Sequence, residues 1–153
     1  MSADRAEQPR APLRSVVVVG AGLAGAQTLA ALRSQGFDGR VTVLGDEGLE
    51  PYDRPPLSKE LLTRTEPAWL RDELGSDLGA ADDVRLDDGA TGLTLDEGRV
   101  TVRTTAGEVI ADAAVLATGA HARLPHGWDA LTLHTAADAA ALRAGLGRGA
   151  RLV

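Results

Sequence analysis

The chain has 153 residues, of which 44% are hydrophobic and 25% charged, a composition typical of one soluble globular domain. Its formal net charge of −6 argues against nucleic acid and anionic membrane surfaces as partners. The sequence has no cysteine, which excludes disulfides, a thiolate nucleophile and a cysteine-ligated iron–sulfur cluster, so redox chemistry would need a bound cofactor.

The first segment, residues 1–12, is polar, contains two prolines and predicts a flexible tail. It has no apolar core of the kind found in a secretory signal. No apolar run in the chain reaches the length of a membrane span. We therefore expect a cytoplasmic protein without membrane contact.

A buried strand is predicted over residues 15–19, where four valines stand in a row, and an alanine-rich helix over 23–35. The turn between them reads G-A-G-L-A-G and matches the G-x-G-x-x-G pattern of dinucleotide-binding turns. In such a turn Gly20 allows the tight bend, Gly22 lets the backbone approach a pyrophosphate, and Gly25 lets helix and strand pack closely. An ordinary strand–turn–helix connection is the alternative.

The first residues of this helix, Leu23 and Ala24, would present unpaired N–H groups and the positive end of the helix dipole to phosphates. A second strand is predicted over 40–44. Asp46 follows it, about 20 residues after the glycine turn, the distance at which a carboxylate accepts hydrogen bonds from a ribose diol. Glu47 is the competing acid, and a solvated loop acid is the alternative.

The stretch P-Y-D-R-P-P-L-S-K-E at residues 51–60 is stiffened by two adjacent prolines. Ser58 is predicted to cap a short helix over 59–62. Judged by residue type alone, Arg54 and Lys59 form either a positive site beside a cofactor or a pair of solvated charges on a proline-rich turn.

Less regular sequence follows. A helix could begin at Glu66-Pro67, and Trp69 is interpreted as a packing residue. A third parallel strand is predicted over 83–86, and a three-stranded antiparallel meander over 93–110. The aspartates beside the third strand are interpreted as a solvated acidic loop and not a metal site, because no loop with ligand spacing surrounds them. They are Asp82, Asp83, Asp87 and Asp88.

A further buried strand is predicted from residue 113 and ends in Ala117-Thr118-Gly119. Small residues at the carboxyl end of a parallel strand let a cofactor approach. The histidines after it lack the spacing of a metal site and are interpreted as loop residues. They are His121, His126 and His134.

The last part of the chain predicts one helix. Trp128 is interpreted as a packing residue. Thr135 and Asp138 predict a capping box that begins a helix ending near residue 144. Residues 151–153 predict the start of another strand.

The stretch P-Y-D-R-P-P-L-S-K resembles the P-Y-x-R-P-P-L-S-K motif of FAD-dependent ferredoxin reductases. This family includes putidaredoxin-type and dioxygenase-type reductases and apoptosis-inducing factor. The glycine turn and the A-T-G at 117–119 are similar to those of the same family. The resemblance extends from Ser15 to about residue 153, although segment 63–81 is more acidic and glycine-rich than the family's apolar helix there.

The resemblance implies a role for the residues of the two motifs. The glycine turn holds the FAD pyrophosphate, and Asp46 holds the adenosine ribose. Arg54 and Lys59 correspond to the motif's arginine and lysine. Because the family's lysine approaches the flavin ring and stabilises the reduced, anionic flavin, Lys59 is the expected catalytic residue.

Four further cofactor-binding residues follow from the same resemblance. Ala90 matches the position at which the backbone reaches the adenine. Thr118 and Gly119 lie against FAD. Arg123 matches an arginine near the pyrophosphate.

The predicted fold is α/β, a Rossmann-like parallel sheet with a dinucleotide fingerprint and an antiparallel three-stranded meander. The expected organisation is a tail at 1–12, an FAD-binding segment at 13–134, and a linker helix at 135–153. That last segment would also contain the start of an NAD(P)H domain. We expect the rest of that domain to be missing, because no second glycine fingerprint occurs.

The resemblance implies the FAD-binding part of a flavin-dependent pyridine-nucleotide oxidoreductase. In that family, electrons pass from NAD(P)H through FAD to an iron–sulfur protein such as a ferredoxin. We expect this chain alone to be inactive, because FAD would occupy its one fingerprint. A small NAD-binding dehydrogenase domain and a non-catalytic remnant are the alternatives.

Overall fold

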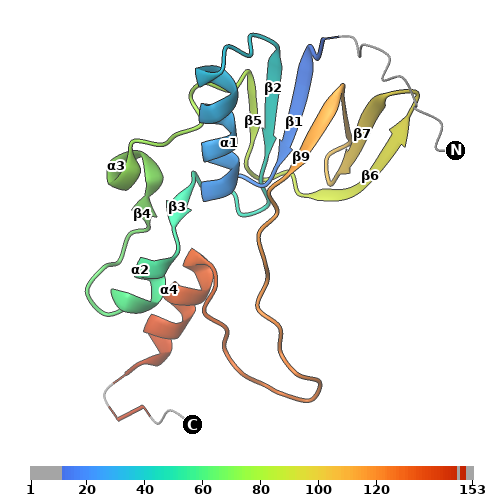
Figure 1. The fold of residues 1–153 in the computed structure, drawn as a ribbon. Helices are drawn as coiled ribbons and strands as arrows, with labels where there is room; N and C mark the ends of the chain where they lie inside the picture. The colour runs from blue at the N-terminus through green and yellow to red at the C-terminus, as the bar shows by residue number, and fades with distance from the viewer. Residues whose placement is uncertain (1–11, 148, 151–153) are drawn as a thin grey trace, which may run out of the picture.

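The computed structural model describes residues 12–147 and 149–150, which form an α/β fold (Figure 1). The strands are β1 (Ser15–Val19), β2 (Arg40–Leu44), β3 (Tyr52–Asp53), β4 (Ala68–Trp69), β5 (Asp83–Arg85), β6 (Ala90–Asp96), β7 (Arg99–Thr104), β8 (Glu108–Ala111) and β9 (Ala113–Leu116). The helices are α1 (Leu23–Ser34), α2 (Pro55–Lys59), α3 (Leu70–Leu74) and α4 (Ala136–Gly145).

Four strands form a parallel sheet in the order β5-β2-β1-β9. These strands begin where the sequence predicts them, at residues 15, 40, 83 and 113. The predicted parallel sheet is confirmed. The carboxyl ends of its strands lie at one edge, below the sheet in Figure 1.

The valines of β1 alternate between two apolar cores, because successive side chains of a strand point to opposite faces. Val16 and Val18 pack with Leu29 of α1. Val17 and Val19 pack with Val102 of the neighbouring antiparallel sheet. The parallel sheet is therefore covered by α1 on one face and by the antiparallel sheet on the other (Figure 1).

The antiparallel sheet has the order β6-β7-β8 and confirms the predicted meander. Glu97 and Gly98 form the turn from β6 to β7, both with positive φ. Gly107 lies in the turn from β7 to β8 with φ +152°. That second turn lies close to the loop after β5, because Thr105 donates a backbone hydrogen bond to the Gly89 carbonyl at 3.0 Å.

The short elements β3, β4, α2 and α4 lie beyond the carboxyl edge of the sheet (Figure 1). Arg143 of α4 donates to the carbonyls of Leu61 (2.9 Å) and Arg64 (2.8 Å), just after α2. The predicted capping box of α4 is confirmed, because the Thr135 hydroxyl accepts from the Asp138 N–H at 3.1 Å and the Asp138 carboxylate accepts from the Thr135 N–H.

The predicted helix start at residue 59 is wrong. Helix α2 begins at Pro55, because prolines in the first turn have φ preset for a helix and lack N–H groups that would be unpaired there. Ser58 lies within the helix, and its hydroxyl donates to the Pro55 carbonyl at 3.3 Å.

The helix predicted from Glu66-Pro67 begins later, at Leu70. The residues before it form β4, which pairs antiparallel with β3. This pairing places Trp69 edge-to-face on Tyr52, with ring centroids 6.4 Å apart, and confirms Trp69 as a packing residue.

Two burial predictions near the end of the sheet are wrong. Strand β9 is only half-buried, and its last residue, Leu116, is 67% exposed, because within the described residues β9 pairs only with β1. Trp128 is 68% exposed and does not pack. It lies on the long connection from β9 to α4, which runs away from the sheet and then turns back toward the start of α4 (Figure 1).

The predicted strand at 151–153 and all of the predicted tail except Pro12 lie outside the described residues. Among the helices that are described, none combines the length and apolar character needed to cross a membrane.

Candidate functional site

A cavity of about 240 Å³ lies at the carboxyl edge of the parallel sheet. Open α/β sheets bind their ligands at this edge, outside the ends of the strands. The glycine turn after β1, the loop after β2 and the residues after β9 all line it. Three segments that are far apart in the sequence therefore meet at one cavity.

The glycines of the turn differ in what surrounds them. A Cβ on Gly20 would lie 2.1 Å from the Ala117 carbonyl oxygen, and Gly20 has φ +114°. A Cβ on Gly25 would lie 1.9 Å from the Gly20 carbonyl oxygen. A Cβ on Gly22 would meet nothing within 4 Å. Gly20 and Gly25 are therefore required by packing, whereas Gly22 leaves open space at the cavity.

Helix α1 begins at this open position. Its N-cap is Gly22, which has no side chain to accept the first N–H groups of the helix. Leu23 and Ala24 also line the cavity. The N-terminus of α1 thus presents backbone donors to the cavity, an arrangement suited to an anion.

The two acids after β2 have different surroundings. Asp46 is exposed, lines the cavity and makes no hydrogen bond to any other described residue. Glu47 accepts hydrogen bonds from the Tyr52 hydroxyl and from Arg54 Nη2, the latter at 2.5 Å. Asp46 is therefore the carboxylate left to accept from a ligand.

Arg54 forms the centre of what we call the clamp, a cluster of Glu47, Tyr52, Arg54 and the N-terminus of α4. Its guanidinium donates to Glu47 and to the His134 carbonyl at 2.5 Å, and lies 5.4 Å from the centroid of the Tyr52 ring. The Tyr52 hydroxyl accepts from the Ala136 N–H at 3.0 Å. The clamp joins the loop after β2 to α4.

Burial of the phenol, together with its hydrogen bond to Glu47, raises the pKa of Tyr52 to about 12. The sequence pattern assigns no role to Tyr52, and it presents Glu47 only as the alternative to Asp46 and not as a partner of Arg54. One indication was available, because Tyr52 and Arg54 are two residues apart and share a side of an extended segment.

The structure brings most of the predicted site residues to the cavity, but not all. Thr118 and Gly119 line it. Ala90 lines an adjoining hollow with Asp46 and Thr118. Lys59 is exposed at the end of α2 and Arg123 is exposed on the connection after β9; neither lines the cavity.

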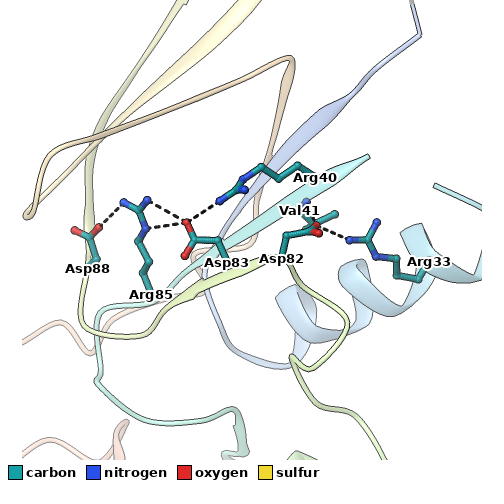
Figure 2. Close-up of polar contacts among 7 residues, drawn as sticks. All are labelled: Arg33, Arg40, Val41, Asp82, Asp83, Arg85 and Asp88. Carbon is teal, nitrogen blue, oxygen red and sulfur yellow. Dashed lines mark hydrogen bonds and ion pairs between the residues drawn. The ribbon is translucent and has the colours of Figure 1, made fainter. Parts of the chain in front are cut away.

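The interpretation of the acidic run as a solvated loop is wrong for Asp83 and Asp88. Asp88 is only 4% exposed. Asp83 pairs with Arg85 at 3.0 Å and with Arg40 at 3.5 Å, and Arg85 also pairs with Asp88 at 3.5 Å (Figure 2). Because Arg40 belongs to β2 and Arg85 to β5, Asp83 links the two neighbouring strands.

Asp82 makes a separate contact on the α1 side of the sheet. It accepts from the Val41 N–H at 2.7 Å and pairs with Arg33 at 2.8 Å (Figure 2). The Val41 N–H and Arg33 hold the pKa of Asp82 below its usual range. No group of acids or histidines suited to a metal ion occurs among the described residues.

A family model described as pyridine nucleotide-disulphide oxidoreductase matches residues 14–153. The biphenyl dioxygenase system ferredoxin–NAD(+) reductase component of Paraburkholderia xenovorans is 38% identical over 153 residues, covering 91% of this chain and 35% of its own length. The probable ferredoxin reductase CtmF of Castellaniella defragrans is 38% identical over 143 residues, covering 90% of this chain and 35% of its own.

Two solved structures also match most of this chain. The crystal structure of Fdr9 matches with a TM-score of 0.70 and 42% identity, covering 87% of this chain and 33% of its own. The covalent putidaredoxin reductase–putidaredoxin complex matches with a TM-score of 0.70 and 27% identity, covering 86% and 34%. The chain spans about a third of the length of the relatives it matches.

Proposed function

The chain belongs to the pyridine nucleotide-disulphide oxidoreductase family, and on that premise we propose that it is the FAD-binding part of a ferredoxin–NAD(P)(+) reductase. The observation that carries this proposal is the open space at Gly22, at the N-terminus of α1 and beside Asp46, which bonds to no other described residue. It is supported by the two relatives described above, both of which are named as ferredoxin reductases.

The residues at the cavity fit the adenosine and pyrophosphate parts of FAD. The backbone of Gly20, Gly22 and the first turn of α1 binds the pyrophosphate without interference from a side chain. The Asp46 carboxylate accepts from the two ribose hydroxyls and repels a phosphate placed there. FAD, when bound, supplies the redox chemistry, which no side chain of this chain provides.

The remaining predicted site residues belong to the same proposal. Thr118 and Gly119 border the cofactor, and Ala90 lies on the adenine side of Asp46. Lys59 faces the flavin and Arg123 the pyrophosphate in the complete protein. Since both lie outside the cavity here, they are the residues whose roles most depend on the rest of the enzyme.

The proposal extends to the whole protein, of which this chain is the FAD-binding segment at 13–134 followed by a linker at 135–153. NAD(P)H is the electron donor, a ferredoxin-like iron–sulfur protein is the acceptor, and the cytoplasm is the location. The Paraburkholderia xenovorans relative is named as a ferredoxin–NAD(+) reductase, which supports the donor and the acceptor.

The test is a titration of the purified chain with FAD and with NAD⁺, followed by flavin fluorescence and by calorimetry. We expect saturable binding of FAD, with a shifted flavin absorption band, and weaker binding of NAD⁺. Preferential binding of NAD⁺ would favour the dehydrogenase alternative, and failure to bind either nucleotide by a folded chain would contradict the proposal.

A further inference from the structure

The loop that bears Asp46 rests on the loop that follows β5. The Asp88 N–H donates to the Gly45 carbonyl at 2.8 Å. A Cβ placed on Gly89 would lie 3.1 Å from the Asp46 Cβ, so the Gly89 backbone packs directly against the Asp46 side chain. The position of Asp46 therefore depends on the position of residues 88 and 89.

The Asp88 side chain fixes this second loop to the meander. Its Oδ1 accepts from the Ala106 N–H at 2.9 Å and from the Thr105 hydroxyl at 3.1 Å. Both donors lie in the turn between β7 and β8. The hydrogen-bond donors around it hold the pKa of Asp88 below its usual range, so the side chain is a carboxylate at neutral pH.

The other carboxylate oxygen faces the end of β5. Asp88 Oδ2 lies 3.5 Å from Arg85 Nη1, and Arg85 also pairs with Asp83 at 3.0 Å (Figure 2). A buried carboxylate with two hydrogen-bond donors on one oxygen and a cation beside the other is held in one place, because movement would weaken these contacts. Asp88 thus joins three segments: the loop after β2, the end of β5 and the turn of the meander.

We propose that Asp88 is a positioning residue for Asp46, which anchors the loop behind Asp46 to the meander and so sets the preference of the site for a ribose diol. The inference rests on the proposed function. A carboxylate that accepts from two adjacent hydroxyls must keep its orientation, and a small displacement of its support weakens both hydrogen bonds.

The test compares ADP, the half of FAD that would lie on Asp46, with 2′-deoxy-ADP, which lacks one hydroxyl of the diol. Calorimetry measures both affinities for the 153-residue chain and for the variants Asp88→Asn, Asp46→Asn and the double variant. We expect the wild type to prefer ADP, and Asp88→Asn to reduce that preference by about fivefold. In the Asp46→Asn background, Asp88→Asn should change the preference no further.

Asp82→Asn is the matched control, since it makes the same chemical change on the α1 side of the sheet. It should lower stability and leave the preference for ADP intact. Thr105→Val removes one donor to Asp88 without altering charge, and it should also reduce the preference for ADP. This variant tests the inference even if Asp88→Asn fails to fold.

Three outcomes overturn the inference alone: a wild type that binds ADP and 2′-deoxy-ADP equally, an equal loss of both ligands in the folded Asp88 or Thr105 variant, or an unchanged preference in these variants. A folded wild-type chain that binds neither FAD nor ADP overturns the proposed function and the inference with it. The two failures are therefore distinguishable.

Discussion

The two sides of the cavity are built by different means. The glycine turn on one side is shaped by backbone packing, and its close contacts involve the Ala117 and Gly20 carbonyls and no charged group. The clamp on the other side is held by hydrogen bonds among Glu47, Tyr52 and Arg54. The first side should be insensitive to pH and salt but intolerant of a side chain added at Gly20 or Gly25. The stability of the clamp should depend on pH and salt, because charged side chains hold it together.

The largest expected effect comes from adding a methyl group to the turn. Gly25→Ala should destabilise the fold by about 3 kcal/mol or more, because the new Cβ would lie 1.9 Å from a backbone oxygen that cannot move freely. Gly20→Ala should act similarly. Urea unfolding followed by circular dichroism measures the change.

Gly22 supplies the control for that experiment. Gly22→Ala should alter the free energy of unfolding by less than about 1 kcal/mol, since its Cβ meets nothing within 4 Å. Gly22→Leu should also fold but fill the cavity and abolish FAD binding. A stable Gly25→Ala variant, or a Gly22→Leu variant that binds FAD normally, would contradict this account of the turn.

The next effect tests the clamp. Arg54→Met should lower the free energy of unfolding by about 1–2 kcal/mol, because Glu47 and the His134 carbonyl lose a donor while solvent still reaches the pair. Hydrogen exchange of the α4 amides should accelerate more than that of α1.

Arg71→Met is the matched variant, since Arg71 makes ion pairs with Glu50 and Asp72 that are more than half exposed. We expect a change within about 0.5 kcal/mol. Equal effects of the two arginine variants would show that the clamp contributes no more than a surface ion pair.

The sequence predicts the glycine side of the cavity better than the clamp side, for a physical reason. Strand, turn and helix at 15–34 are determined by neighbouring residues, so local pattern suffices. Arg54 bonds to His134, and Asp88 to Ala106, across long stretches of chain. Such partners depend on the tertiary fold. The sequence pattern alone therefore leaves Asp88 as an apparently solvated charge and leaves Arg54 open between a cofactor site and a solvated turn.

The edge position of β9 could not be predicted for a related reason. Its run of small and apolar residues is typical of a buried strand, and burial depends on whether another strand pairs with its far side. The A-T-G after it nevertheless lies at the cavity as expected from strand-end geometry.

A smaller effect concerns the single tyrosine of the chain. The pKa of Tyr52 is raised to about 12 in the folded protein, against 10.0 for the free side chain. The folded state therefore binds the phenolic proton more tightly, and this stabilisation is present below pH 10 and lost as the pH rises toward 12. Absorbance at 295 nm, about where tyrosinate absorbs, measures the titration directly.

Glu47→Gln should lower that pKa, because the neutral side chain no longer disfavours a phenolate beside it. Tyr52→Phe should remove the absorbance change altogether. A tyrosinate band that forms near pH 10 in the folded wild type would show that Tyr52 is solvated and not part of the clamp.

The smallest expected effect is a difference in stability loss between two hydroxyl groups, one that caps a helix and one that lies inside a helix. Thr135→Ala should destabilise the chain by about 1 kcal/mol, because its hydroxyl accepts from the Asp138 N–H at the start of α4. Ser58→Ala should change stability by less than about 0.5 kcal/mol, because Ser58 is exposed within α2 and its hydroxyl bonds, among the described residues, only to a carbonyl one turn earlier. Urea unfolding of both variants measures the difference. An equal loss in the free energy of unfolding in the two variants would indicate that Ser58 caps a helix that begins at residue 59.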